Sequence, residues 1–184
     1  MVDKDHPDDF VLNTIAHELT HVAQLQYDTD DVFGGPGWLG ESTATYVGYK
    51  ITKALGRTPT FEYDLLDPSW TPKPGKTRWP ALFSRLHMSL NLERHQYSAW
   101  LFFESASIEL GDGVARAVWQ QAAAPGIDGI RAVELAIPLD DHFPRFGVRN
   151  CNRDLKPQQW PYKEHDGTFR TGLKPREVVN VKMG

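Results

Sequence analysis

Two histidines and a glutamate stand at fixed spacing near the start of the chain, within a largely apolar run. His17, Glu18 and His21 form the pattern His-Glu-x-x-His between Phe10 and Leu25. Because an α-helix has 3.6 residues per turn, residues four apart lie on one face, so both imidazoles can reach one metal ion. Glu18 then projects beside that ion without binding it. The spacing predicts a helix that carries two metal ligands.

The chemistry that this pattern serves is the activation of water by zinc. A zinc ion held by three protein ligands keeps one position for water, lowers the pKa of that water towards about 7, and leaves a neighbouring carboxylate to take its proton. Glu18 is therefore the predicted general base. The alternative is a chance match on an amphipathic helix that binds no metal.

A third zinc ligand is expected from the next helix. The turn at residues 34–37 opens a predicted helix from Trp38 to about residue 55. The commonest third ligands are a histidine six residues after the motif or a glutamate on the following helix. Tyr27 stands at the histidine position, whereas Glu41, 20 residues after His21, meets the second option.

With both motifs present, the chain resembles the gluzincin group of zinc metallopeptidases. In that group His-Glu-x-x-His on one helix is joined by a glutamate from a Trp-Leu-x-Glu-x-x-Ala helix, which residues 38–44 match here. The resemblance covers residues 10–50 and extends more loosely to residue 136. It implies zinc as cofactor, a peptide or protein as substrate, His17, His21 and Glu41 as ligands, and Glu18 as general base.

Composition is that of an ordinary globular body. The 184 residues are 40% hydrophobic and 24% charged, with a net charge of −4. Basic residues form no cluster, which argues against nucleic acid as a partner, and no apolar run approaches the ~20 residues of a membrane span. The polar, acidic start is not a signal peptide. A secreted or extracytoplasmic location is implied by the resemblance alone, and the oligomeric state stays open.

The predicted fold is mainly α, with no convincing strand before residue 145. Helices are expected at about residues 8–26, 38–55, 81–92, 97–110, 113–123 and 127–136. A Pro-rich stretch at 58–80 predicts a surface loop, either a wall of the active-site cleft or a structural excursion. We expect a helical zinc-peptidase core at 1–145 and a linker or the start of a further module at 146–184, with one short strand at 176–182.

Gluzincins usually place a β-sheet before the zinc helix. Only 16 residues precede His17, too few for that sheet. The resemblance therefore predicts a zincin-like helical core whose β-sheet subdomain is largely absent from this chain. The chain is expected to be a fragment or catalytic core of a longer protein.

A later tyrosine is a candidate for stabilising the oxyanion of the reaction. Similar peptidases often use a tyrosine or histidine from a later helix for this purpose, and a donor aimed at that charge is commonly worth about 3 kcal/mol. Tyr97 is the predicted donor. His95, His87, Tyr46 and Tyr49 compete with it, and a buried helix-start aromatic is the structural alternative for Tyr97.

The residues that support the ligands depart from the gluzincin pattern in one respect. In some gluzincins an aspartate one turn after the ligand glutamate orients a zinc histidine, but Thr45 stands there. The orienting carboxylate must therefore come from elsewhere or be absent. Asn13, one turn before His17, could help to orient a ligand.

Other polar residues are predicted to have structural roles. Glu104 and Glu109 are expected on a solvated helix face or as supporting partners. His142 and His165 are isolated in the sequence and are predicted not to bind metal.

Three classes of function remain open on sequence grounds. The first is a zinc metallopeptidase, the second a zinc hydrolase of another carbonyl substrate, and the third a non-catalytic binding or scaffolding domain. Glu18 argues against the third, because a structural zinc site is normally closed by a fourth ligand and needs no base.

Overall fold

The computed structural model describes residues 8–27, 37–57 and 99–155, and these residues form six α-helices and one short 3-10 helix. No strand occurs among them, which confirms the mainly α prediction for this part of the chain. Within the same residues, no helix combines the length and the apolar character needed to cross a membrane.

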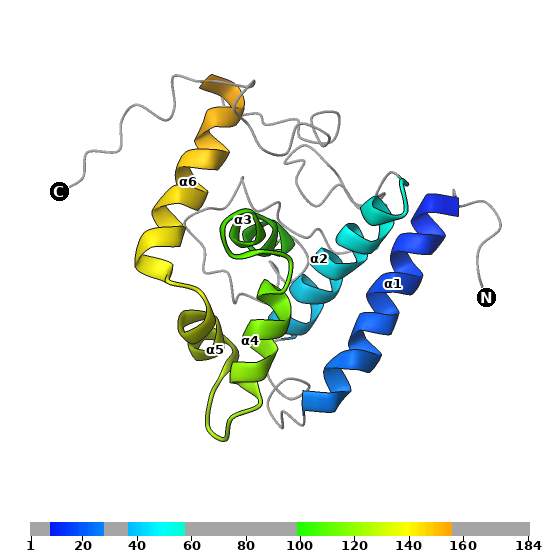
Figure 1. Ribbon diagram of the computed structural model, residues 1–184, viewed down its shortest axis with the longest axis horizontal. Helices are drawn as coiled ribbons and strands as arrows, with labels where there is room; N and C mark the ends of the chain where they lie inside the picture. The colour runs from blue at the N-terminus through cyan, green and yellow to red at the C-terminus, as the bar shows by residue number, and fades with distance from the viewer. Residues whose placement is uncertain (1–7, 28–36, 58–98, 156–184) are drawn as a thin grey trace, which may run out of the picture.

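The two helices that carry the two sequence motifs lie side by side and run in opposite directions (Figure 1). Helix α1 spans Asp8–Gln24 and is continued by the 3-10 helix η1, Leu25–Tyr27. Helix α2 spans Trp38–Ala54, and Gly56 follows with a φ of 70°. Such a positive φ favours glycine, which explains why the helix ends here. Both helices match their predicted ranges to within a few residues.

Four further helices follow residue 98. They are α3 (Trp100–Leu110), α4 (Val114–Ala122), α5 (Gly129–Ala136) and α6 (Leu139–Leu155). Gly111, with a φ of 86°, ends α3. The side chain of Asp128 accepts a hydrogen bond from the backbone N–H of Arg131 and so caps α5. The first three of these helices were predicted.

The hydrophobic core forms where α2, α3 and α4 meet, with α5 and α6 packed around them (Figure 1). Helix α3 is almost wholly enclosed along Trp100–Ser107. Tyr49 of α2 packs its ring against Trp100, with centroids 4.8 Å apart. Burial of an aromatic side chain is among the largest stabilising contributions in a core. This core therefore fixes one face of α2, and the opposite face of α2 packs against α1.

The boundary predicted between residues 145 and 146 falls inside a helix. Helix α6 continues from Leu139 to Leu155, and Phe146 is buried in the core against Phe102. Pro144 lies inside this helix, where a proline removes one backbone donor. The described helical unit therefore extends beyond residue 145, and α6 was missed.

Glu104 does not lie on a solvated face, whereas Glu109 is exposed as one interpretation expected. Glu104 is buried and pairs with Lys50, at 3.5 Å between Oε2 and Nζ. Glu109 pairs with Arg145 at 3.2 Å and also with Arg149, both on α6. Glu104 therefore ties α3 to α2, and Glu109 ties α3 to α6.

Several predictions concern residues outside the described part of the chain. These are the Pro-rich stretch at 58–80, the helix at 81–92, the first residues of the helix predicted from 97, and the module and strand expected after residue 155.

Candidate metal centre

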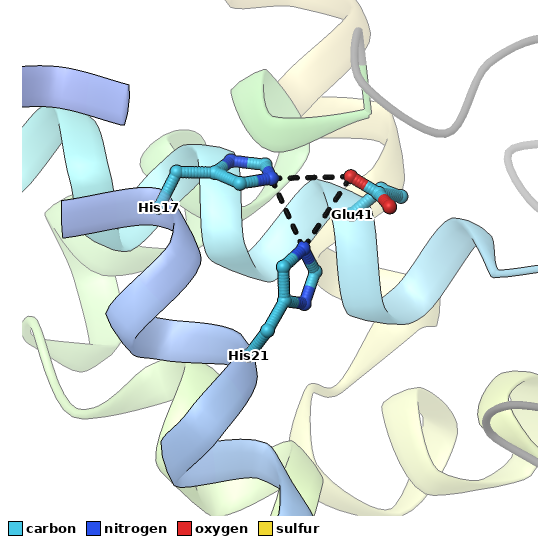
Figure 2. Close-up of side chains that lie close together, drawn as sticks. All are labelled: His17, His21 and Glu41. Carbon is cyan, nitrogen blue, oxygen red and sulfur yellow. Dashed lines mark hydrogen bonds and ion pairs between the residues drawn. The ribbon is translucent and has the colours of Figure 1, made fainter. Parts of the chain in front are cut away.

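The two motif histidines and the glutamate of the second motif converge on one point between α1 and α2 (Figure 2). Nε2 of His17 lies 3.1 Å from Oε2 of Glu41 and 3.1 Å from Nε2 of His21. Nε2 of His21 lies 3.6 Å from the same Glu41 oxygen. Among the described residues, this is the only group of three histidine, cysteine or acidic side chains able to hold one metal ion.

A close approach of the two helices brings these side chains together. Gly48 of α2 faces the backbone of α1, and a Cβ atom there would lie 3.1 Å from the carbonyl oxygen of Asn13 and 3.4 Å from the backbone nitrogen of His17. A larger residue would hold the helices apart. The absence of a side chain at this position therefore allows Glu41 on α2 to reach the histidines on α1.

Thr45 takes the position at which some gluzincins carry an orienting aspartate. Its hydroxyl donates to the backbone carbonyl of Glu41 at 2.7 Å, so the oxygen lone pairs are left to accept a hydrogen bond. Nδ1 of His17 lies 3.4 Å from that oxygen. A hydroxyl therefore supports His17 at the position where some gluzincins have a carboxylate. The orienting group was expected elsewhere or not at all, but the structure places one at this same position.

Gln24 supports the other histidine and was not predicted to do so. Its side-chain oxygen lies 2.8 Å from Nδ1 of His21, and the residue is buried. The signal in the sequence was a glutamine one helical turn after the second motif histidine, a spacing that puts the two side chains on one face. This spacing did not lead to a prediction, because glutamine is usually a surface residue and is expected to face solvent.

These partners determine what the converging atoms can do. A hydrogen bond from each Nδ1–H, to Thr45 and to Gln24, leaves each neutral imidazole with its lone pair on Nε2. Both lone pairs then face each other and the carboxylate of Glu41. Three acceptors at such short range repel one another unless a proton or a cation lies among them. The arrangement could therefore hold a metal ion.

The electrostatics of the group agree with this reading. Partial burial alone raises the pKa of Glu41, but hydrogen bonds and charge from His17 and His21 prevail and lower it to about 2. The hydrogen bond to Glu41 raises the pKa of His21, against the lowering effect of burial, and the charges of Glu41 and Glu18 add to the rise. The site therefore carries a permanent carboxylate and attracts positive charge.

The site is open on one side. The side chains of His17, His21 and Glu41 are 15%, 24% and 25% exposed, and Glu18 is exposed on the adjoining face of α1. That outer face also presents large apolar side chains around Glu18, each at least half exposed: Ile15, Leu19, Val22 and Leu25. The group of ligands is therefore partly accessible to solvent.

The candidate oxyanion donors have different outcomes. Tyr46 and Tyr49 are buried on the side of α2 that faces α3. The hydroxyl of Tyr46 donates to the carbonyl of Asp112 at 3.3 Å, and that of Tyr49 accepts from Lys53 at 3.0 Å. Both hydroxyls are engaged inside the core, so neither tyrosine can act as the oxyanion donor. Tyr97, His87 and His95 lie outside the described residues.

Two further sequence interpretations can be compared with the structure. Asn13 is buried, and its side-chain oxygen accepts a hydrogen bond from Thr52 at 3.4 Å, which links α1 to α2. His142 is buried against the ring of Phe102 and pairs with Glu109 at 3.5 Å, away from the metal centre. Among the described residues it belongs to no group of possible metal ligands.

The chain was compared with family models, with curated proteins and with solved structures, and none of the three comparisons found a match. The likeness to gluzincins accordingly rests on the two motifs and remains an expectation.

Proposed function

We propose that this protein is a zinc-dependent metallopeptidase of the gluzincin type, with zinc held by His17, His21 and Glu41 and with Glu18 as general base. The observation that carries the proposal is the convergence of two Nε2 lone pairs and one carboxylate oxygen within 3.1–3.6 Å. A set of two histidines and one glutamate with open access on one side is the ligand set of catalytic rather than structural zinc.

The distances between donors fit zinc. Bonds of about 2.0–2.2 Å to nitrogen and oxygen, at tetrahedral angles, place neighbouring ligand atoms about 3.3 Å apart. The three separations here, 3.1, 3.1 and 3.6 Å, lie on both sides of that value. Magnesium and calcium prefer oxygen ligands in larger numbers. The donor set therefore favours zinc over these ions.

A zinc ion bound there would supply Lewis acidity, which polarises a carbonyl and lowers the pKa of water. The chain's own contribution is the carboxylate of Glu18. It is exposed, adjoins His17 on α1, and is close enough for its charge to raise the pKa of His21, along with the larger effect of Glu41. In this position Glu18 accepts a proton from the attacking water and delivers it to the leaving amine nitrogen.

The surface around Glu18 favours a peptide with apolar side chains as substrate. Ile15 and Leu25 are 50% and 62% exposed on the helix face that carries this base. Apolar side chains that reach such a surface leave water and so contribute binding energy. A strongly charged substrate would gain nothing there.

The test is digestion of a mixed peptide library by the zinc-loaded protein, with products identified by mass spectrometry. Cleavage is expected beside apolar residues, and Glu18→Gln should keep its zinc but lose at least about 100-fold in kcat/KM. Glu134→Gln is the matched control, since Glu134 is exposed and pairs only with Arg131 among its described contacts. Undiminished cleavage by Glu18→Gln would overturn the base assignment, and absence of cleavage by the zinc-loaded wild type would overturn the peptidase proposal.

A further inference from the structure

Gln24 is a buried amide whose two ends are both engaged. Its relative exposure is 3%, although glutamine is usually a surface residue. The side-chain nitrogen lies 3.1 Å from the carbonyl oxygen of Gly40 and 3.0 Å from the hydroxyl of Thr43, and the side-chain oxygen lies 2.8 Å from Nδ1 of His21. A polar side chain enclosed to this extent has a defined orientation.

The partners of Gln24 determine which end of the amide points to the histidine. The carbonyl of Gly40 can only accept a hydrogen bond, so the group that faces it must be the NH2 group. Thr43 gives the same answer, because its hydroxyl donates to the carbonyl of Leu39 at 2.6 Å and accepts from the indole N–H of Trp119 at 2.9 Å. The side-chain oxygen of Gln24 therefore faces His21.

The consequence concerns the tautomer of His21. An oxygen that can only accept, 2.8 Å from Nδ1, requires the hydrogen of the neutral ring to be on Nδ1. Nε2 then carries the lone pair and points to His17 and Glu41. The hydrogen-bond chain runs from Trp119 on α4 through Thr43 on α2 to Gln24 on α1, so three helices contribute to it.

We infer that Gln24 is a positioning residue, which holds His21 as the Nδ1–H tautomer with Nε2 directed at the metal. This inference rests on the proposed zinc centre for its purpose, whereas the tautomer itself can be observed without metal. Loss of a hydrogen bond that orients a metal-binding histidine typically weakens metal affinity by about 10–100-fold. The residue acts through His21 and does not touch the reacting atoms.

The first test is nitrogen-15 NMR of the imidazole rings in the metal-free wild type, at a pH where His21 is neutral. The expected result is a protonated Nδ1 and an unprotonated Nε2 for His21, with the resonance assigned by its loss in His21→Asn. The opposite tautomer would overturn the inference. This readout needs no folded variant of Gln24 and no bound zinc.

The second test is zinc affinity, measured by competition with a chelating indicator. Gln24→Leu should bind zinc about 10–100-fold more weakly than the wild type, and Gln24→Glu should recover part of that loss because a carboxylate oxygen can accept from the same Nδ1–H. Gln26→Leu makes the same chemical change at an exposed position of η1 and should leave the affinity unchanged.

The outcomes of the second test separate this inference from the proposed function. Wild-type affinity in Gln24→Leu, with zinc bound by the wild type, would overturn the positioning role alone. Absence of zinc from the wild type and from all variants would overturn the proposed metal centre. Circular dichroism of each metal-free variant shows whether an altered affinity reflects a change of fold.

Discussion

The hydroxyl oxygen of Thr45 lies 3.4 Å from Nδ1 of His17 and donates its own proton to the carbonyl of Glu41. Thr45 thus connects two of the three proposed ligands. Thr45→Val removes this hydroxyl at nearly constant volume. We expect zinc affinity to fall by about 10-fold, at the lower end of the range for loss of an orienting partner, because the hydrogen bond is long.

The matched variant is Thr45→Ser, which keeps the hydroxyl and removes only a methyl group. It should bind zinc nearly as tightly as the wild type in the same competition assay. Equal affinities of Thr45→Val and the wild type would show that His17 does not depend on Thr45.

Glu41 is the proposed ligand that gives the site its negative charge. Glu41→Gln keeps the size and a carbonyl oxygen but removes the negative charge that attracts a cation. Zinc affinity should fall by more than the roughly 10–100-fold expected for a supporting residue. Isothermal titration of the metal-free protein with zinc measures this change.

The control for Glu41 is Glu134→Gln, on the exposed face of α5. An equal loss in both variants would mean that overall charge, rather than coordination, explains the effect. Undiminished zinc binding by Glu41→Gln would remove Glu41 from the ligand set.

Gly48 allows α1 and α2 to approach each other, so Gly48→Ala should disturb the site. Alanine favours a helix by up to about 1 kcal/mol over glycine, but the new methyl group would lie 3.1 Å from the Asn13 carbonyl and 3.4 Å from the His17 nitrogen. We expect a small shift of α1 that offsets the gain in stability and weakens zinc binding severalfold.

Gly40→Ala is the matched control on the same helix. The added methyl group there meets only the side-chain oxygen of Gln24, at an ordinary 3.7 Å. This variant should gain stability in urea unfolding and keep its zinc affinity. The same result for Gly48→Ala would show that the close approach at Gly48 is not required.

The sequence predicted the helices whose signals are local. Helices α1, α2, α3 and α4 have an apolar pattern and a glycine or polar residue at an end, and their ranges were predicted closely. Helix α6 was missed because it contains Pro144 and is polar over most of its length. What stabilises it is tertiary, namely Phe146 in the core and two arginines paired with Glu109, and such contacts leave no periodic signal.

In the site, too, the features set by local spacing were predicted and those set by tertiary contacts were not. The positions of His17, His21 and Glu41 follow from spacing within two helices, and the structure brings the three together. The partners of their outer nitrogens could not be predicted, since they depend on how closely α1 approaches α2. Thr45 was interpreted as a missing carboxylate, and Gln24 was not considered as a partner, yet these two residues contact the histidines.

His142 should make stability depend on pH. Burial lowers its pKa below 6.5, and the charge of Arg149 acts in the same direction, whereas Glu109 and the backbone of Phe102 oppose the shift. Between the folded and unfolded pKa values the unfolded chain binds more protons, so the free energy of unfolding falls as pH falls below about 6.5. Urea unfolding of metal-free protein at pH 7.5 and 5.5 measures the effect.

The variant His142→Gln isolates this contribution from those of the other histidines. His21 has a raised pKa, so it stabilises the metal-free fold when protonated, and this stability is lost as pH rises through its folded pKa. The difference between wild type and His142→Gln cancels that effect. A smaller loss of stability in the variant on acidification is expected, and an equal loss in both would contradict the assignment.

The central claim is that His17, His21 and Glu41 hold one zinc ion. It is tested most directly by the metal content of the purified protein, measured by elemental mass spectrometry for the wild type beside His21→Ala, with both incubated with zinc and then freed of excess. The account predicts about one zinc per chain in the wild type and little or none in the variant. No zinc in the wild type, or equal zinc in both proteins, would contradict it.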